Sequence, residues 1–530
     1  MGRPIGLRDN LIQRVNVGDL LTRSASRAPR HLAVVDGDRR WSYSEFNSWV
    51  NRIAHGFVRC GFERGDAIAI MSRNRAEFLA LYFACAKTGL VVVPVNLMWK
   101  QGELAYVLEH AGARCVVAEP EFLEPLARLR AELPALREIV VLPDADDATG
   151  HGYLAFTAFE QGMAASEPER LVTDRDPVSY LYTSGTTSAP KGVVSSHLAI
   201  YLGALSVALD TGLSGRDRAL AMLPLFHTSP LNSLCTPAVA AGATIVVRNG
   251  FDAEPVLDLF ETERITTLLA LPLMYRQLLQ VQLARRRDVT ALRLALYAMA
   301  PMPVHELRRL IEVFGCQFAL IFGQTEMSPV TTVFRPEHQL THAGSVGTPS
   351  SNVQIAIMDG QGRLVSNGEV GEIVYRGPQT LSGYLKNPQA TEEAFRHGWF
   401  HSGDVGYFDA DGLLWFKDRF KDVIKSGGEN VASVEVEQAL YDAEPGILEV
   451  VVIGLPHPKW GEAVTAVVVP QPGQRIANDT LLEKVRSRLS PFKCPKAVIL
   501  VDRLPKTATN KVQKAELRTR FAAYYEGASA

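Results

Sequence analysis

A run of hydroxyl side chains at residues 182–193, YTSGTTSAPKGV, carries the strongest local signal for chemistry. Hydroxyls, and backbone N–H groups left accessible by Gly185 and Gly192, can bind the oxygens of a polyphosphate, while Lys191 partly neutralises its charge. The preceding residues 178–181 predict a strand that leads into this loop. It is not a Walker A loop, because no Gly-Lys-Ser/Thr follows at the required spacing. The chemistry suggested is the binding of a nucleotide triphosphate, but similar loops are as often plain solvated turns, so the loop alone leaves both interpretations open.

A second polar group follows the stretch 318–329, FALIFGQTEMSP. The pattern predicts a strand that ends at Gly323, with Thr325 and Glu326 just beyond it. Ligands gather beyond the carboxyl ends of parallel strands, and a carboxylate beside a hydroxyl can hold Mg²⁺ between phosphates. A lone Thr-Glu pair is more often a helix cap, so the metal interpretation depends on the phosphate loop lying nearby.

The C-terminal third contains two further polar groups. Residues 399–430 are the densest run of signals, with Asp404 directly after His-Ser-Gly, and the Asp-Gly pair at 411–412 predicts a hairpin turn. Near the end, a polar loop at 507–511 precedes a predicted last helix and closes with Lys511. A terminal lysine is ordinarily a surface charge, so Lys511 needs a partner site before it carries a role.

In this order, the motifs resemble those of the adenylate-forming (AMP-binding) superfamily, which holds acyl-CoA synthetases, aryl-CoA ligases, peptide-synthetase adenylation domains and luciferases. The resemblance covers nearly the whole chain and points to the branch of fatty acyl-CoA, 4-coumarate and 4-chlorobenzoate CoA ligases. It implies a mixed α/β fold: a large N-terminal domain of stacked αβ subdomains with a β-barrel-like subdomain, and a small mobile α+β domain. The expected boundaries are 1–418 and 422–530, with a hinge at 419–421 centred on Lys421.

The resemblance also implies roles for individual residues. The expected catalytic residues are Lys511, Glu326, Lys191 and His227. The residues expected to bind ATP or coenzyme A are Thr183, Ser184, Gly185, Thr186, Thr187, Lys191, Ala300, Pro301, Phe322, Gly323, Gln324, Thr325, Asp404, Arg419, Gly427, Gly428 and Trp460. The expected metal ligands, for Mg²⁺, are Glu326 and Thr186. The expected lining of the acid pocket is His227, Thr228, Ala298, Ile321, Gly323 and Ser328.

Four positions depart from the family pattern. Ser188 and Asn510 stand where a glycine is usual, Met299 where a small residue is usual, and Phe322 where a tyrosine stacks near adenine. Ser188 bears on the flexibility of the phosphate loop, and Asn510 immediately precedes Lys511.

The implied reaction has two steps, in which a carboxylate attacks the α-phosphorus of Mg·ATP and a thiol, coenzyme A, then displaces AMP. The first step alone does not separate this enzyme from an amide-forming ligase or from an enzyme that loads a carrier protein. A nucleotide-binding regulatory protein without catalysis would not need both Glu326 and a mobile Lys511. The mostly apolar pocket predicts an aromatic or medium-chain fatty acid. A free amino acid is disfavoured, because no acidic residue that could meet its ammonium group occurs between Leu223 and Leu234.

Alternating strands and helices must position these residues. The stretches expected to form strands are 32–35, 67–71, 91–95, 220–223, 243–247 and 267–271. The stretches expected to form helices are 42–60, 77–90, 102–111 and 255–263, the first opening with a Ser42-x-x-Glu45 cap. This alternation predicts a parallel sheet covered on both faces. From residue 342, recurring glycines predict short antiparallel strands.

Composition narrows the class of protein. With 530 residues the chain is long enough for at least two cores, and 47% hydrophobic with 21% charged residues is typical of a globular protein. The net charge of −2 gives no electrostatic case for nucleic acid or an anionic membrane, so small-molecule partners are expected, with a homodimer allowed for. The six cysteines show no CxxC spacing, and neither a targeting segment nor a membrane-spanning run is recognised, which favours the reducing cytoplasm.

Overall fold

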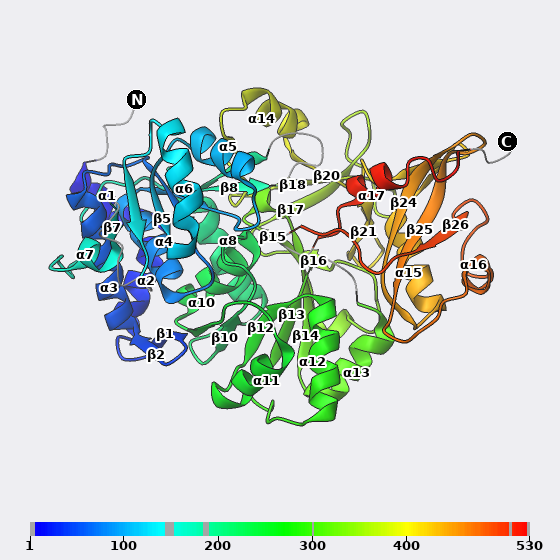
Figure 1. Cartoon of the computed structure of the whole chain (residues 1–530), viewed down its shortest axis with the longest axis horizontal. Coiled ribbons are helices and arrows are strands. Elements are labelled where there is room, and N and C mark those ends of the chain that lie inside the picture. Colours follow the sequence, from blue (N-terminus) through cyan, green and yellow to red (C-terminus); the bar gives the residue numbers. More distant parts are fainter. Residues whose placement is uncertain (1–5, 144–152, 184–189, 299–301, 508–510, 527–530) are drawn as a thin grey trace.

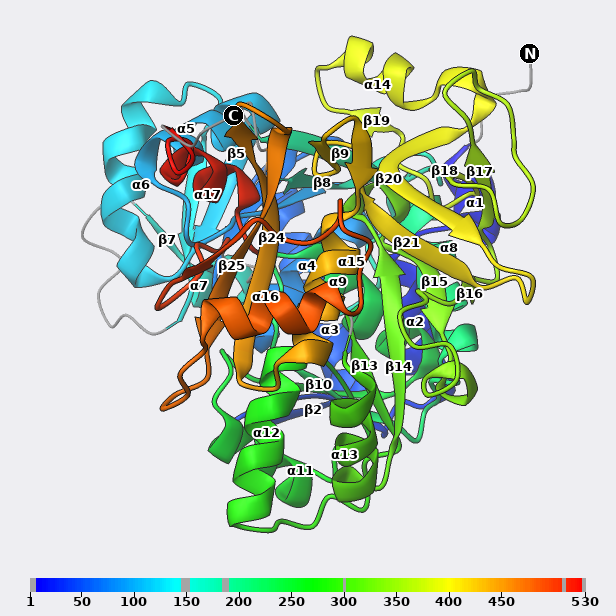
Figure 2. The ribbon, with the colours of Figure 1, turned by 90° about the vertical axis from the view of Figure 1, so that its right-hand side faces the viewer.

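The computed structural model describes residues 6–143, 153–183, 190–298, 302–507 and 511–526. Figure 1 shows a large N-terminal part, coloured blue to yellow, and a smaller C-terminal part, in orange and red, at its right-hand side. Figure 2 turns this smaller part toward the viewer, so that its strands lie over the large part. The predicted mixed α/β architecture with a large and a small part is confirmed. Within the described ranges, no helix is long and apolar enough to cross a membrane.

An eight-stranded sheet carries the phosphate-loop stretch at one side, in the order β19-β9-β8-β4-β3-β5-β6-β7. Its strands are β19 (Gly383–Tyr384), β9 (Lys191–Ser196), β8 (Pro177–Thr183), β4 (Val91–Pro94), β3 (Ala67–Met71), β5 (Ala113–Ala118), β6 (Glu138–Val141) and β7 (Leu154–Ala155). The strands from β8 to β7 run parallel, as predicted, whereas β9 and β19 pair antiparallel. The strand expected before the loop is therefore present, and the chain returns after it as the antiparallel strand β9.

A nine-stranded sheet has the order β16-β15-β14-β13-β12-β10-β11-β1-β2. Its strands are β16 (Thr348–Pro349), β15 (Val330–Phe334), β14 (Gln317–Gly323), β13 (Leu294–Tyr297), β12 (Thr267–Ala270), β10 (Arg218–Ala221), β11 (Thr244–Val247), β1 (Leu32–Asp36) and β2 (Arg39–Ser42). The strand expected at 220–223 begins and ends two residues earlier, as β10. The predicted end of β14 at Gly323 is confirmed.

Helices pack between and around these sheets. The helices between the sheets include α2 (Gly18–Arg27), α3 (Tyr43–Arg59), α4 (Ala76–Thr88), α8 (His197–Asp210) and α10 (Thr236–Ala241). The other helices of the large part include α1 (Leu7–Gln13), α5 (Gln101–Ala111), α6 (Leu123–Leu129), α7 (Phe156–Glu160), α11 (Ala253–Thr262), α12 (Pro272–Ala284) and α13 (Val304–Phe314). One apolar core joins side chains of both sheets, including Val34 of β1 and Ile68 of β3. The capping box predicted at Ser42 and Glu45 is present at the start of α3.

The recurring glycines after residue 342 build a four-stranded antiparallel sheet, in the order β17-β18-β20-β21. These strands are β17 (Gln354–Met358), β18 (Gly371–Arg376), β20 (Phe400–Phe408) and β21 (Leu414–Arg419), and the short helix α14 (Pro388–Ala394) lies nearby. The hairpin turn predicted at 411–412 joins β20 to β21, with Gly412 at a φ of 78° that favours glycine.

The C-terminal part has its own sheet and cores. It contains β22 (Ile424–Ser426), β23 (Glu429–Val431), α15 (Ser433–Ala443), β24 (Ile447–His457), β25 (Gly461–Pro470), α16 (Asn478–Arg486), β26 (Ala497–Leu500) and α17 (Lys514–Arg520). Its two apolar clusters draw only on residues from Ile424 onward. It contacts the large part through Arg276 of α12, whose Nη1 donates to the Leu448 carbonyl at 3.0 Å and whose guanidinium lies over the Tyr441 ring. The hinge at 419–421 remains a prediction.

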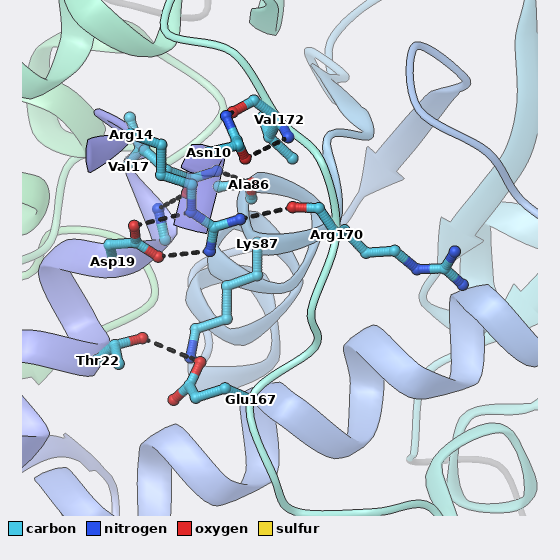
Figure 3. Close-up of polar contacts among 12 residues, drawn as sticks. Asn10, Arg14, Val17, Asp19, Thr22, Ala86, Lys87, Glu167, Arg170 and Val172 are labelled. Atoms are coloured by element: carbon cyan, nitrogen blue, oxygen red, sulfur yellow. Dashed lines mark hydrogen bonds and ion pairs between the residues drawn. The ribbon is translucent and has the colours of Figure 1, made fainter. Parts of the chain in front are cut away.

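A buried lysine ties the N-terminal helices to the segment before β8 (Figure 3). The Lys87 side chain, 0% exposed, donates to Asn47 Oδ1, Asn51 Oδ1 and Glu167 Oε2 at 2.7, 2.7 and 2.6 Å. Thr22 also donates to Glu167. A buried ammonium group is tolerated only when its hydrogen bonds are satisfied, so this cluster fixes how α2, α3 and α4 pack together.

We therefore expect Lys87→Met to lower the free energy of unfolding by about 3 kcal/mol, because it leaves two asparagine oxygens and a carboxylate without their shared donor. Urea unfolding followed by tryptophan fluorescence measures the change. Lys425→Met, at an exposed lysine, is the control and should shift stability by no more than about 0.5 kcal/mol. Equal effects of the two variants would show that the buried cluster does not stabilise the fold.

Candidate active site

Lys511 of the small part lies within electrostatic range of two polar residues of the large part. Its charge contributes, after burial, to lowering the pKa of His227 to about 4. It also opposes the rise that burial causes in the pKa of Asp404. Thr507 and Lys511 are bonded to each other, since Thr507 N donates to Lys511 O at 2.8 Å and Lys511 N donates to Thr507 Oγ1 at 3.2 Å. Three residues that the sequence singled out from distant stretches therefore influence one another electrostatically.

The ammonium group of Lys511 is electrostatically unfavourable where it lies. Burial, followed by the nearby cations Arg419 and Lys421, lowers the pKa of Lys511 to about 8. As a whole residue Lys511 is exposed, but the two cations act in the same direction, so the lowered pKa does not depend on burial alone. Excess positive charge at this point is suited to an anionic ligand.

Asp404 is a buried carboxylate, 4% exposed, on β20. Burial raises its pKa to about 6, and Arg419, whose Nε lies 3.3 Å from Asp404 Oδ1, partly offsets that effect. Asp404 and Arg419 are directly paired residues of β20 and β21. The two strands thus place a carboxylate and a guanidinium side by side.

A bulge in β20 sets the direction of Asp404. Between the pairs Glu372↔Val405 and Val374↔His401, one residue of β18 faces three residues of β20, the last of which is Asp404. The middle residue, Gly403, has a φ of 73°, a left-handed conformation that glycine adopts without strain. Bulges of this kind redirect side chains beside functional sites.

Glu326 lies in the short turn after β14, and a residue absent from the prediction contacts it. Tyr384 Oη donates to Glu326 Oε1 at 3.2 Å, and Lys191 Nζ lies 5.1 Å from the centre of the Tyr384 ring. Tyr384 therefore bridges two predicted catalytic residues. Its segment, SGYLKNP, indicates only a turn, and the contact joins residues 58 positions apart, so no local pattern reveals it.

The turn from Gly323 to Pro329 requires close backbone approach. A Cβ at Gly323 would lie 2.0 Å from the Pro329 carbonyl oxygen, so only glycine fits. Gln379 Nε2 donates to the carbonyls of Met327 and Val330 and holds the turn from behind. Among the described residues, Gln324 Nε2 and Ser328 Oγ are buried without a hydrogen-bond partner, as expected of groups that bind a polar ligand.

The predicted acid pocket draws on separate elements of the large part. Ala298, Ile321, Thr228 and Ser328 are all buried. His227 Nδ1 accepts from Ser229 N at 3.2 Å, and burial keeps the ring neutral at physiological pH, so the proton lies on Nε2. His227 can therefore donate one hydrogen bond to a carboxylate without adding a charge.

A buried hydrogen-bond chain behind this pocket was not predicted. Asn232 Nδ2 donates to Thr228 Oγ1 at 3.1 Å, and Tyr82 Oη donates to Asn232 Oδ1 at 3.1 Å. Asn232 lies in a π-helical turn, Leu231–Cys235, after the one-turn helix α9 (Thr228–Pro230). Such turns often occur at functional sites. Through these two hydrogen bonds, Tyr82 of helix α4 holds Thr228 in place by way of Asn232.

The residues expected near coenzyme A form a separate group within the small part. Gly427 N donates to the Trp460 carbonyl at 2.8 Å, and the Trp460 ring packs 3.1 Å from where a Gly427 Cβ would lie. Gly428 is exposed beside it. In the part of the chain that the structure describes, no hydrogen bond or ion pair joins these three residues to Glu326, Asp404 or Lys511.

Several predicted residues lie outside the described residues. They are Ser184, Gly185, Thr186, Thr187, Ala300 and Pro301, together with the departures Ser188, Met299 and Asn510. Thr183 and Lys191, on either side of the phosphate loop, are described and pair with each other across β8 and β9. Phe322 is also described, and the centre of its ring lies 5.5 Å from the centre of the Phe416 ring.

The residues present fit a shared Mg²⁺ site. Within the described ranges, no cluster of three or more His, Cys, Asp or Glu side chains could hold a metal by itself. Mg²⁺ commonly takes one or two carboxylates and completes its shell with substrate phosphates and water. Glu326, oriented by Tyr384, could supply such a carboxylate.

Comparison with known proteins shows which family the chain matches. The family model "AMP-binding enzyme" matches residues 21–385, and "AMP-binding enzyme C-terminal domain" matches residues 435–511. The chain is 37% identical to a feruloyl-CoA synthase from Amycolatopsis sp over 95% of its length and 99% of that protein. It is 33% identical to an indoleacetate–CoA ligase from Aromatoleum aromaticum, covering 96% of this chain and 98% of the relative.

A solved structure agrees with these matches. The anthranilate CoA ligase AuaEII in complex with anthranoyl-AMP superposes with a TM-score of 0.89 at 26% identity, covering 97% of this chain and 99% of that one. The chain therefore belongs to the AMP-binding enzyme family, in the acyl-CoA synthetase, or acid–thiol ligase, branch of the adenylate-forming enzymes.

Proposed function

We propose that this enzyme joins a carboxylic acid to coenzyme A in two steps, through an acyl-adenylate. The observation that carries the proposal is the position of Lys511, which comes from the small part and lies within electrostatic range of His227 and Asp404 of the large part. A lysine held in so unfavourable an electrostatic position is explained if the charge acts on an anionic transition state.

In the first step, the acid attacks the α-phosphorus of ATP and pyrophosphate leaves. Asp404 accepts hydrogen bonds from the ribose hydroxyls and fixes the nucleotide. Lys511 and Lys191 stabilise charge that builds on the phosphate, while neutral His227 orients the carboxylate through Nε2–H. Mg²⁺, when bound by Glu326 and phosphate oxygens, supplies further charge neutralisation.

In the second step, the thiol of coenzyme A attacks the acyl carbon and AMP leaves. Gly427, Gly428 and Trp460 are the candidate coenzyme A contacts, and they lie apart from the adenylation residues in this arrangement. A rotation of the small part about residues 419–421 would exchange the two sets. Lys421 is the proposed hinge residue.

We infer that the acid is aromatic, with a medium-chain fatty acid as the second choice. Two relatives and the solved neighbour are named for feruloyl, indoleacetate and anthranilate substrates, all of which carry rings. The buried pocket residues Ala298 and Ile321 are apolar and suit a ring. An amine or a carrier protein in place of coenzyme A would use the same first step, and direct product analysis separates the three acceptors.

Replacing Lys511 tests the proposed role of the small part. Lys511→Ala should slow adenylate formation by about 10²- to 10³-fold, the loss typical of one preorganised charge-stabilising group. Thioester formation from presynthesised acyl-adenylate should stay near normal, because the lysine is then away from the reaction. Pyrophosphate release and thioester formation are measured separately. Lys484→Ala, at an exposed surface ion pair with Glu444, is the control, and full adenylation by Lys511→Ala would contradict the mechanism.

The pH dependence follows from two shifted groups. Lys511 must be charged, which holds below its pKa of about 8, and Asp404 must be ionised, which holds above its pKa of about 6. We expect kcat/KM for ATP in the adenylation step to be flat between these values and to fall about tenfold per pH unit outside them.

The variant Lys511→Arg assigns the alkaline limb. Arginine stays protonated throughout this range, so the decline above pH 8 should disappear, whatever the absolute rate. A decline that persists unchanged in Lys511→Arg would assign the limb to another group.

A further inference from the structure

Glu372 of β18 is a buried carboxylate that no part of the proposed mechanism uses. Its side chain is 9% exposed, and three donors converge on it. Gly403 N donates to Glu372 Oε1 at 3.0 Å, while His401 Nδ1 and Arg396 Nη2 lie 2.7 and 3.2 Å from Oε2. Both carboxylate oxygens are therefore occupied, and one of them holds the backbone of the residue that precedes Asp404.

His401 and Arg396 hold this carboxylate from the side opposite Gly403. The His401 ring spans two acceptor groups, with Nδ1 2.7 Å from Glu372 Oε2 and Nε2 3.1 Å from the Arg396 carbonyl oxygen. Arg396 Nη2 donates to the same carboxylate oxygen at 3.2 Å, and its charge offsets part of the cost of burying the carboxylate. The His397 ring is centred 5.7 Å from that of His401.

Gly403 is the point at which this cluster meets the nucleotide site. Its N–H is bound by Glu372, and its carbonyl accepts from Phe420 N at 3.0 Å. Its φ of 73° lies in the left-handed region, and a Cβ there would meet nothing within 4 Å. The requirement for glycine is thus conformational. Because Gly403 is held through both its N–H and its carbonyl, its position fixes both Asp404, which follows it, and the segment that leads into Lys421.

We propose that Glu372 is a positioning residue for ribose recognition, acting through the Gly403 N–H to hold the Asp404 carboxylate in its binding direction. His401 and Arg396 hold the Glu372 side chain in that position. The inference rests on the proposed function, because it takes Asp404 as the ligand of the ribose hydroxyls. It adds a residue that contacts neither substrate nor reacting atoms.

Nucleotide binding tests this role without turnover. AMP and 2′,3′-dideoxyAMP are titrated calorimetrically into the wild-type chain and into Glu372→Gln. The wild type should bind AMP at least about tenfold more tightly, because two hydrogen bonds to a buried carboxylate are lost with the hydroxyls. In Glu372→Gln the ratio of the affinity for AMP to the affinity for 2′,3′-dideoxyAMP should shrink to less than about threefold. The affinity for the dideoxy nucleotide itself should be nearly unchanged. An amide whose NH₂ turns toward Gly403 leaves the Gly403 N–H without an acceptor. An amide that keeps its oxygen at Gly403 instead sets its NH₂ against the Arg396 donor, which pushes the side chain away from Gly403.

If Glu372 had a purely structural role, Glu372→Gln would weaken the binding of both nucleotides equally and leave the ratio of the two affinities unchanged. That result would overturn the inference. Glu369→Gln, the same change at an exposed residue three positions earlier, should keep the wild-type ratio. If Glu372→Gln does not fold, Gly403→Ala disturbs the same peptide from within, and an unchanged ratio there counts equally against the proposal. If the wild-type protein binds AMP and 2′,3′-dideoxyAMP equally well, Asp404 is not the ligand of the ribose hydroxyls. That outcome overturns this inference alone. Chain that binds no AMP overturns the proposed function as well.

Discussion

The proposed site depends on cations held within electrostatic range of one another. After burial, Arg419 and Lys421 help to lower the pKa of Lys511, while Asp404 and Asp422 act in the opposite direction. Arg419 also pairs with the buried carboxylate of Asp404. Such a site is stable only because the surrounding fold holds it together, and a polyphosphate would relieve the repulsion. Lys511 also comes from a part of the chain with its own cores. The repulsion between Lys511 and the other cations therefore depends on how the small part is placed against the large part.

Strand ends and irregularities supply the precision that this site needs. Glu326 follows the end of β14, Lys191 opens β9, and Asp404 leaves a bulge in β20. Each group is then held from behind: Tyr384 contacts Glu326, and Glu372 binds the peptide before Asp404. Glu372 is buried and Tyr384 is half-buried, and polar supports of this kind fix charged groups within hydrogen-bonding tolerance.

The sequence predicts the features that depend on short-range patterns. The limits of β3, the capping box of α3, the end of β14 and the turn at Gly412 all depend on residues within a few positions of one another. The antiparallel return of β9 could not be predicted in this way, because a loop rich in hydroxyls does not determine the direction of the next strand. Tyr384 and Glu372 were missed for a related reason. Their partners lie 58 and 31 positions away. The pairing of β18 with β20 brings Glu372 to Gly403, whereas Tyr384 lies in β19 and Glu326 follows β14, strands of two different sheets.

Pyrophosphate release with a panel of acids, in the presence of Mg·ATP and with and without coenzyme A, tests the central claim most directly. The account predicts release that depends on an aromatic acid such as a cinnamate or benzoate, at a rate above that of medium-chain fatty acids. It also predicts an acyl-CoA product only when coenzyme A is present. Release that depends instead on a free α-amino acid, or no acid-dependent release across the panel, would contradict the account.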